Sequence, residues 1–168
     1  MSAQISPLAS DSHSNGTVFQ PEVRLQALSI NDLDALLAIE QRAYSHPWTR
    51  GNFTDALASG YQIQLLKGGP ELLGYFVAMP GVDEAHLLNL TVAPEFQGQG
   101  WARLLLDALA LWARGQKAQW LWLEVRVSNL RARQIYERYG FRHVGERKRY
   151  YPAADGMRED AIVMSVPL

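Results

Sequence analysis

The strongest constraint on the fold is an alternation of strand-like and helical runs in the middle of the chain. Residues 85–92 form an apolar, strand-like run, residues 101–114 carry apolar side chains at helical spacing, and residues 120–127 alternate again. A helix that joins two neighbouring strands makes a β-α-β crossover, whose strands are usually parallel and whose connection is right-handed. The chain is therefore predicted to be α/β, with a parallel pair of strands near the centre of its sheet.

The remaining elements predict mostly antiparallel strands around this crossover, with helices on both sides. Gly68, Gly69 and Pro70 suit a hairpin turn, and Gly140 suits a helix end. With the crossover, the pattern predicts a mixed sheet without internal repeats. The other predicted strands are 23–28, 61–67, 72–79, 141–149 and 160–166, and the other predicted helices are 31–43, 49–58 and 130–139.

Length and composition limit the class of protein. The chain has 168 residues, 48% of them hydrophobic, with a net charge of −1 and no cysteine. This predicts one soluble domain, residues 21–168, after a Ser-rich flexible tail at 1–20, and it excludes disulfides, a cysteine nucleophile and a strongly basic nucleic-acid binder. Without a signal peptide or an apolar run of membrane-spanning length, we expect a cytoplasmic protein.

A glycine-containing turn precedes the crossover helix. Gly98 and Gly100 allow backbone N–H groups to approach an anion closely, and the free N–H groups of a helix start point at the same place. The turn has neither the G-x-G-x-x-G nor the P-loop pattern, and by itself it equally suits an ordinary connection. We interpret it as a candidate site for the phosphates of a cofactor.

Two residues downstream have side chains suited to proton transfer. Glu124 shares a strand face with Trp120 and Trp122, and partial desolvation makes such a carboxylate a better proton acceptor; the alternative is an ion pair with Arg126 or an exposed strand glutamate. Tyr136 lies on a helical face where core filling is the alternative. A phenol nonetheless has the proton affinity to protonate a departing thiolate.

Taken together, these motifs resemble a known family. The order strand, Gln97-x-x-Gly100-x-Ala102, helix, strand, helix and paired terminal strands resembles the GNAT acetyltransferases, whose loop is Gln/Arg-x-x-Gly-x-Gly/Ala. Within them the sequence looks like RimI, the ribosomal-protein alanine N-acetyltransferases. The segments that resemble RimI are 40–43, 47–48, 121–129, 136–141, 150–152 and 158–161.

The resemblance implies a GNAT fold, acetyl-CoA as the acetyl donor, a protein N-terminus as the acceptor, and no metal. It implies a proton acceptor at Glu124 and a proton donor at Tyr136, with direct transfer in a ternary complex. Trp101 is bulkier than the family's usual aliphatic residue, and Met157 is an additional residue before Arg158. The residues implied to bind acetyl-CoA are Leu90, Thr91, Val92, Gly98, Gln99, Gly100, Trp101, Ala102, Arg103 and Asn129.

The sequence is also compatible with other functions. The chain also suits a GNAT enzyme acting on a small amine, or a non-catalytic CoA-binding module. The basic run at 147–149 is expected to be a solvated strand edge rather than a phosphate or RNA contact. His46, His86 and His143 lack the spacing of a metal site, and Trp48 and Tyr150 are candidates for the acceptor groove or the core.

Overall fold

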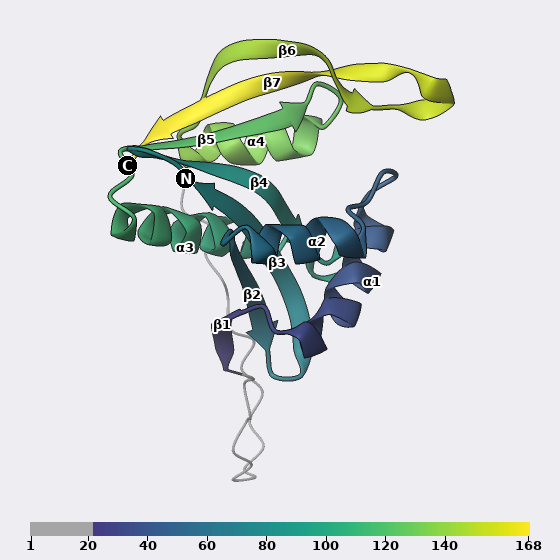
Figure 1. The fold of residues 1–168 in the computed structure, drawn as a ribbon, viewed down its shortest axis with the longest axis vertical. Coiled ribbons are helices and arrows are strands. Elements are labelled where there is room, and N and C mark those ends of the chain that lie inside the picture. Colours follow the sequence, from purple (N-terminus) through teal and green to yellow (C-terminus); the bar gives the residue numbers. More distant parts are fainter. Residues whose placement is uncertain (1–21) are drawn as a thin grey trace, which may run out of the picture.

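The computed structural model describes residues 22–168, so the predicted tail lies outside the described residues. Seven strands form one sheet in the order β1-β2-β3-β4-β5-β7-β6 (Figure 1). Only the β4–β5 pair is parallel, and this confirms the predicted mixed, mostly antiparallel sheet. The strands are β1 (Val23–Ala27), β2 (Gln62–Gly68), β3 (Glu71–Pro80), β4 (Glu84–Val92), β5 (Trp120–Arg126), β6 (Arg142–Pro152) and β7 (Arg158–Pro167).

The helices form where their caps and apolar spacing predict. Thr49 caps α2 by accepting a hydrogen bond from the Asn52 backbone N–H, and Gly140 ends α4 at a φ of 118°. Short 3-10 turns lie at Ile30–Asp32, Pro94–Phe96 and Ala154–Gly156. The helices are α1 (Leu33–Ala43), α2 (Arg50–Ala58), α3 (Trp101–Gly115) and α4 (Leu130–Tyr139). No helix among residues 22–168 is long and apolar enough to cross a membrane.

The sheet separates two hydrophobic cores. Alternation along β3 sends Tyr75 into one core and Phe76 into the other. The helices α1 and α2 close the first core with side chains such as Leu36, while α3 and α4 close the second with side chains such as Leu109. Both faces of the central strands are therefore buried, which explains their nearly continuous apolar sequence.

The β6–β7 hairpin is longer than the sequence predicts. Its ladder continues past the irregular register between Arg147 and Tyr151, so Tyr151 still pairs with Glu159. The strands therefore reach Pro152 and begin at Arg158, where the periodicity indicates 149 and 160. Figure 1 shows this hairpin extending beyond the end of β5.

The parallel strands separate halfway along their length. Pairing between β4 and β5 covers only Glu84–Leu87 against Trp120–Leu123. Beyond Leu87 the backbone of β4 no longer has β5 as its neighbour in the sheet, so its polar groups on that side need other partners. The separation lies at the carboxyl ends of both strands, where α/β sheets usually bind ligands.

Candidate active site

Two grooves meet where β4 and β5 separate. The α3 groove, of about 690 Å³, runs between β4, the start of α3 and one side of α4. The β5 groove, of about 640 Å³, runs between β5, the segment at 44–48 and the end of β6. Five residues line both grooves, so a molecule in one can reach a molecule in the other: Tyr44, Leu90, Asn129, Ala132 and Tyr136.

The glycine turn presents an open backbone to the α3 groove. Gly98 and Gly100 have φ of 80° and 90°, and a Cβ on either would meet nothing within 4 Å. Gly100 is also the N-cap of α3, so the first N–H groups of that helix have no partner within it. Because Arg103 and Arg131 line the same groove, its chemistry fits a phosphate group.

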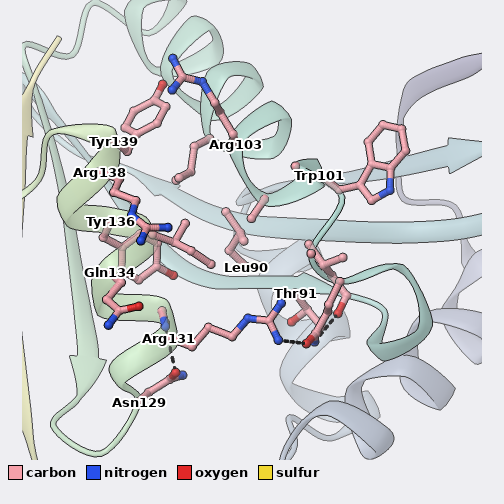
Figure 2. Close-up of a pocket in the computed structure, with 18 of the residues that line it drawn as sticks. Leu90, Thr91, Trp101, Arg103, Asn129, Arg131, Gln134, Tyr136, Arg138 and Tyr139 are labelled. Atoms are coloured by element: carbon pink, nitrogen blue, oxygen red, sulfur yellow. Dashed lines mark hydrogen bonds between the residues drawn. The ribbon is translucent and has the colours of Figure 1, made fainter. Parts of the chain in front are cut away.

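The free edge of β4 offers backbone carbonyls to the same groove. The Leu90 carbonyl accepts a hydrogen bond from the Tyr44 hydroxyl at 3.1 Å, and the Val92 carbonyl accepts one from the Gln97 amide at 3.1 Å. Gln97 in turn accepts a bond from Arg131 at 2.8 Å, and this contact joins the two sides of the groove (Figure 2). Such an edge suits an amide-containing chain, because amides can hydrogen-bond to strand backbone.

The structure brings together nine of the ten residues predicted to bind the cofactor, and all nine line the α3 groove. Gln99 is the exception: its side chain accepts a bond from the Trp101 indole at 3.0 Å and does not line the groove. Asn129 caps α4 by accepting from the Ala132 backbone N–H at 3.1 Å. The Thr91 side chain is buried and bonded to Tyr44 and Asn89.

Glu124 lies in the wall of the β5 groove, with 13% of its side chain exposed. Its ion-pair partner is Arg147 of β6, whose Nε lies 3.0 Å from Glu124 Oε1. The predicted alternative, a pair with Arg126, is wrong. Arg126 instead donates hydrogen bonds to Glu159 of β7 at 3.2 Å and to the carbonyl of Pro152, at the end of β6, at 2.9 Å.

Tyr136 is buried at the junction of the two grooves and packs edge-on against Phe141 at 5.7 Å. Burial raises the pKa of the Tyr136 phenol well above its ordinary value of 10, and the neighbouring Tyr44 and Tyr151 raise it further. Burial also raises the pKa of Tyr44 to about 12. Both phenols therefore keep their protons at neutral pH and are able to donate them.

Sequence reasoning missed a buried polar network beneath the β5 groove. Glu40, only 1% exposed, accepts from the Trp48 backbone N–H at 2.8 Å, from Asn89 at 3.2 Å, and from the Tyr75 hydroxyl. Thr91 then bonds to Asn89 at 2.8 Å. A glutamate at a core position of the α1 apolar pattern was the available signal, since buried carboxylates need partners.

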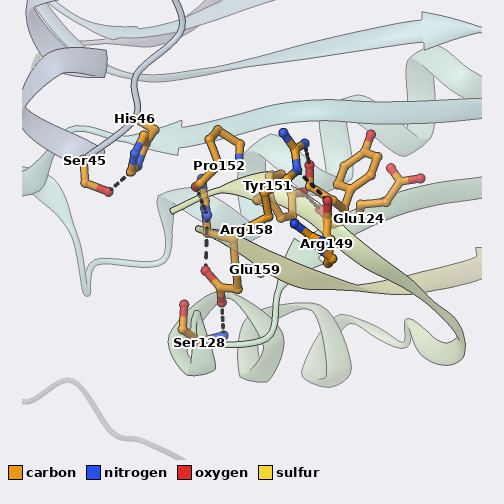
Figure 3. A network of polar contacts seen from close by, with 11 residues as sticks. Ser45, His46, Glu124, Ser128, Arg149, Tyr151, Pro152, Arg158 and Glu159 are labelled. Carbon is orange, nitrogen blue, oxygen red and sulfur yellow. Dashed lines mark hydrogen bonds and ion pairs between the residues drawn. The ribbon is translucent and has the colours of Figure 1, made fainter. Parts of the chain in front are cut away.

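The mouth of the β5 groove also differs from expectation. Of the two candidates for the groove or the core, Trp48 both lines the groove and packs against a core, while Tyr151 rather than Tyr150 lines the groove from β6. Tyr151 donates to the Glu124 carbonyl at 2.9 Å and stacks under Arg126. Figure 3 shows Tyr151 beside Glu124, and His46 belongs to the opposite wall.

The fold and the loop define the class of this protein. Residues 33–141, more than half of the chain, match the acetyltransferase (GNAT) family. The separated parallel strands, the glycine turn at a helix start and the open strand edge all lie within the matched residues. Acetyl-CoA, predicted from the sequence, is the acetyl donor of this family.

Individual relatives narrow the class. The chain is 39% identical over 145 residues to the [ribosomal protein bS18]-alanine N-acetyltransferase of Escherichia coli (strain K12), covering 86% of this chain and 97% of that one. Its counterpart in Haemophilus ducreyi is 35% identical, with 86% and 99% covered. The crystal structure of the ribosomal-protein-S18-alanine N-acetyltransferase from Escherichia coli superposes with a TM-score of 0.79 at 37% identity, covering 87% of this chain and 94% of that one. The chain belongs to the RimI family of GNAT acetyltransferases.

Proposed function

We propose that this enzyme transfers the acetyl group of acetyl-CoA to the free α-amino group of a protein N-terminus, that of an alanine in ribosomal protein bS18. The curated relatives carry that activity in their names. The single structural observation behind the proposal is the meeting of the two grooves at Tyr136, with Glu124 in the wall of one of them. A ribosomal-protein substrate places the reaction in the cytoplasm.

In this proposal the α3 groove binds the donor. The open backbone at Gly98 and Gly100, with the first N–H groups of α3 and the nearby Arg103, would hold the pyrophosphate. The edge of β4 at Leu90 and Val92 would hold the pantetheine amides, in exchange for the present bonds from Tyr44 and Gln97. Asn129 lies where it would contact the same chain.

The β5 groove would bind the acceptor and direct the protons. Glu124 takes one proton from the α-ammonium group, directly or through a water, and the freed nitrogen attacks the acetyl carbonyl carbon. The carbon–sulfur bond then breaks, and Tyr136 gives its proton to the departing sulfur. The nitrogen sheds its second proton, and the phenolate regains one from solvent, which leaves amide, CoA thiol and one proton.

Proton cost favours an α-amine over lysine as the acceptor. An α-amine with a pKa of about 8 costs roughly 1 kcal/mol to deprotonate at pH 7, whereas a lysine at about 10.4 costs nearly 5 kcal/mol. A single carboxylate base manages the smaller cost more easily. The lining of the β5 groove also includes both Glu124 and Trp48, and its volume of about 640 Å³ suits a peptide better than a small amine.

A peptide-selectivity assay tests the acceptor. We expect acetyl-CoA turnover with peptides that begin with alanine, and little with the same peptides N-terminally blocked but carrying an internal lysine. Turnover with a free polyamine and none with alanine-starting peptides would sink the proposal in favour of a small-amine acetyltransferase.

Substitution of the proposed base tests the mechanism. We expect Glu124→Gln to lower kcat by about 10²- to 10³-fold at pH 7, because the amide cannot take up the proton. The lost activity should partly return at high pH, where the free amine forms without help. Full activity in Glu124→Gln would exclude this residue as the base. If the natural chain bound CoA but acetylated none of the acceptors, a non-catalytic binding module would be favoured instead.

A further inference from the structure

The carboxylate of Glu124 already has a cation bound to it. Arg147 of β6 lies with its Nε 3.0 Å from Glu124 Oε1, and Glu124 itself lines the β5 groove. The Arg147 guanidinium also lies over the ring of Tyr150, 5.5 Å from its centre. An acceptor α-ammonium needs the same carboxylate, so the two cations have to share or exchange it.

The two partners differ in how firmly they are held. Glu124 is 13% exposed, and a carboxylate at that depth is costly to leave without a cation. Arg147 is 54% exposed, so its side chain can swing into water and be solvated there at little cost. The register of β6 also becomes irregular directly after Arg147, which leaves this part of the strand less constrained by its ladder.

The other charged and titratable groups near Glu124 are otherwise engaged. Arg126, on the same strand, is bound to Glu159. Tyr151 donates its proton to the Glu124 carbonyl rather than to the carboxylate. Tyr136, from α4, is neutral because burial raises its pKa. His46, across the groove, is bonded to Ser45 at 3.1 Å.

We propose that Arg147 is the exchangeable counter-ion of Glu124, which the α-ammonium group of the acceptor displaces on binding. Arg147 is thus a specificity-determining residue: it balances the charge of the carboxylate while no acceptor is bound, and it admits only an acceptor whose own positive charge replaces it. Neutral N-termini, including the acetylated product, leave Arg147 in place. The inference rests on the proposed function, because it takes Glu124 to be the group that meets the amine.

Peptide binding to the CoA complex tests the exchange without turnover. Two peptides are compared by calorimetry, one starting with alanine and one in which a propionyl group replaces that alanine, so that only the ammonium is missing. The Arg147→Gln variant should bind the alanine peptide about two- to fivefold tighter than the natural chain does. The peptide's ammonium group no longer has to displace a half-exposed arginine from Glu124. The propionyl peptide should bind as it does to the natural chain.

Two matched variants complete the experiment. Arg147→Lys keeps the positive charge and should restore the natural affinity for the alanine peptide. Lys148→Gln removes the same charge one residue further along β6, where Lys148 pairs with Glu146 and Asp160, and should change neither affinity. If Lys148→Gln raised the affinity for the alanine peptide as much as Arg147→Gln does, the effect would come from the overall positive charge of the basic segment, and the specific exchange at Glu124 would be overturned.

Other outcomes are equally decisive. If Arg147→Gln changes both peptides alike, the side chain only shapes the groove and the inference fails. The gain in affinity for the alanine peptide should also disappear when Arg147→Gln is combined with Glu124→Gln. If the gain persists in the double variant, the proposed pairing of Arg147 with Glu124 is overturned. The proposed function fails on a different result, full turnover by Glu124→Gln alone, so the two failures are distinguishable.

Discussion

At the residue scale, the Tyr136 side chain has two parts with different roles: its hydroxyl is the proposed proton donor, and its ring packs in the core. Its ring fills the core against Phe141, and both tyrosine and phenylalanine supply that ring. We expect Tyr136→Phe to lower kcat by about 10²-fold or more, because the sulfur loses its proton donor, while the melting temperature changes little. Steady-state kinetics and calorimetry measure both. Tyr139→Phe on the same helix is the control, and a loss of stability in Tyr136→Phe that matches its loss of rate would support a role in the core alone.

A second residue-scale prediction concerns acid stability. Asp32 accepts hydrogen bonds from Lys67 at 2.6 Å and from the Ser29 hydroxyl at 2.7 Å, and these contacts lower the pKa of Asp32 from 3.8 to about 2. A lowered folded-state pKa contributes stability above about pH 4, and that contribution is lost as the pH falls from 4 to 2. Asp32→Asn should therefore cost about 1 kcal/mol at pH 7, since solvent screens part of the interaction, and less at pH 3.

Urea unfolding at the two pH values checks this. The exposed Asp55 on α2 provides the control, since Asp55→Asn should shift the midpoint little at either pH. A deficit in Asp32→Asn that stays constant from pH 7 to pH 3 would contradict the assignment to the ionised carboxylate.

At the element scale, the position of β4 depends on one glycine in its neighbour. A Cβ on Gly74 of β3 would lie 2.5 Å from the Thr91 carbonyl and 3.2 Å from Val92 Cα, so backbone has to move. Gly74→Ala should cost about 2 kcal/mol of stability and weaken acetyl-CoA binding, because the displaced strand is the one that lines the α3 groove. Gly68→Ala meets only the flexible side chain of Leu73 and should do neither. Unfolding curves and acetyl-CoA titration compare the two, and equal effects would mean that strand position does not matter.

The elements themselves were largely predictable, since each depends on local sequence. Thr49 marks a helix start through its side-chain cap, Gly140 marks a helix end through its positive φ, and the turn at Gly68 joins two alternating runs. The contacts between elements were not predictable in this way. Either Arg126 or Arg147 carries a charge that could pair with Glu124, and only the arrangement of β5, β7 and β6 in the sheet decides that Arg147 does so.

In the candidate site too, residues in local motifs were predictable and residues brought in by long-range contacts were not. The loop and the strand residues at Leu90 and Val92 follow from a local motif and its resemblance to a family. Tyr44 follows from neither: it reaches the Leu90 carbonyl from the end of α1, more than forty residues earlier in the chain. Contacts across that distance depend on how the helices lie over the sheet, which no single stretch of sequence encodes.

At the scale of the whole molecule, one sheet serves two cores and should bind them into one cooperative unit. Leu36 lies fully buried beneath α1 and Leu109 fully buried beneath α3, on opposite faces. Because β3 supplies side chains to both faces, neither core can open without disturbing the strand that supports the other. Leu36→Ala and Leu109→Ala should each cost about 3 kcal/mol and lower the same single transition.

Hydrogen exchange read by mass spectrometry distinguishes this from independent halves. In either variant, amides of α1 and of β7 should lose protection by the same free energy, although the substitution touches only one face. The two losses should also add in the double variant, because the two side chains belong to separate clusters of buried residues on opposite faces of the sheet. Loss of protection confined to the substituted face would show that the cores unfold separately. The two grooves would then be built from parts of unequal stability, with the donor side depending on the α3 core and the acceptor side on the α1 core.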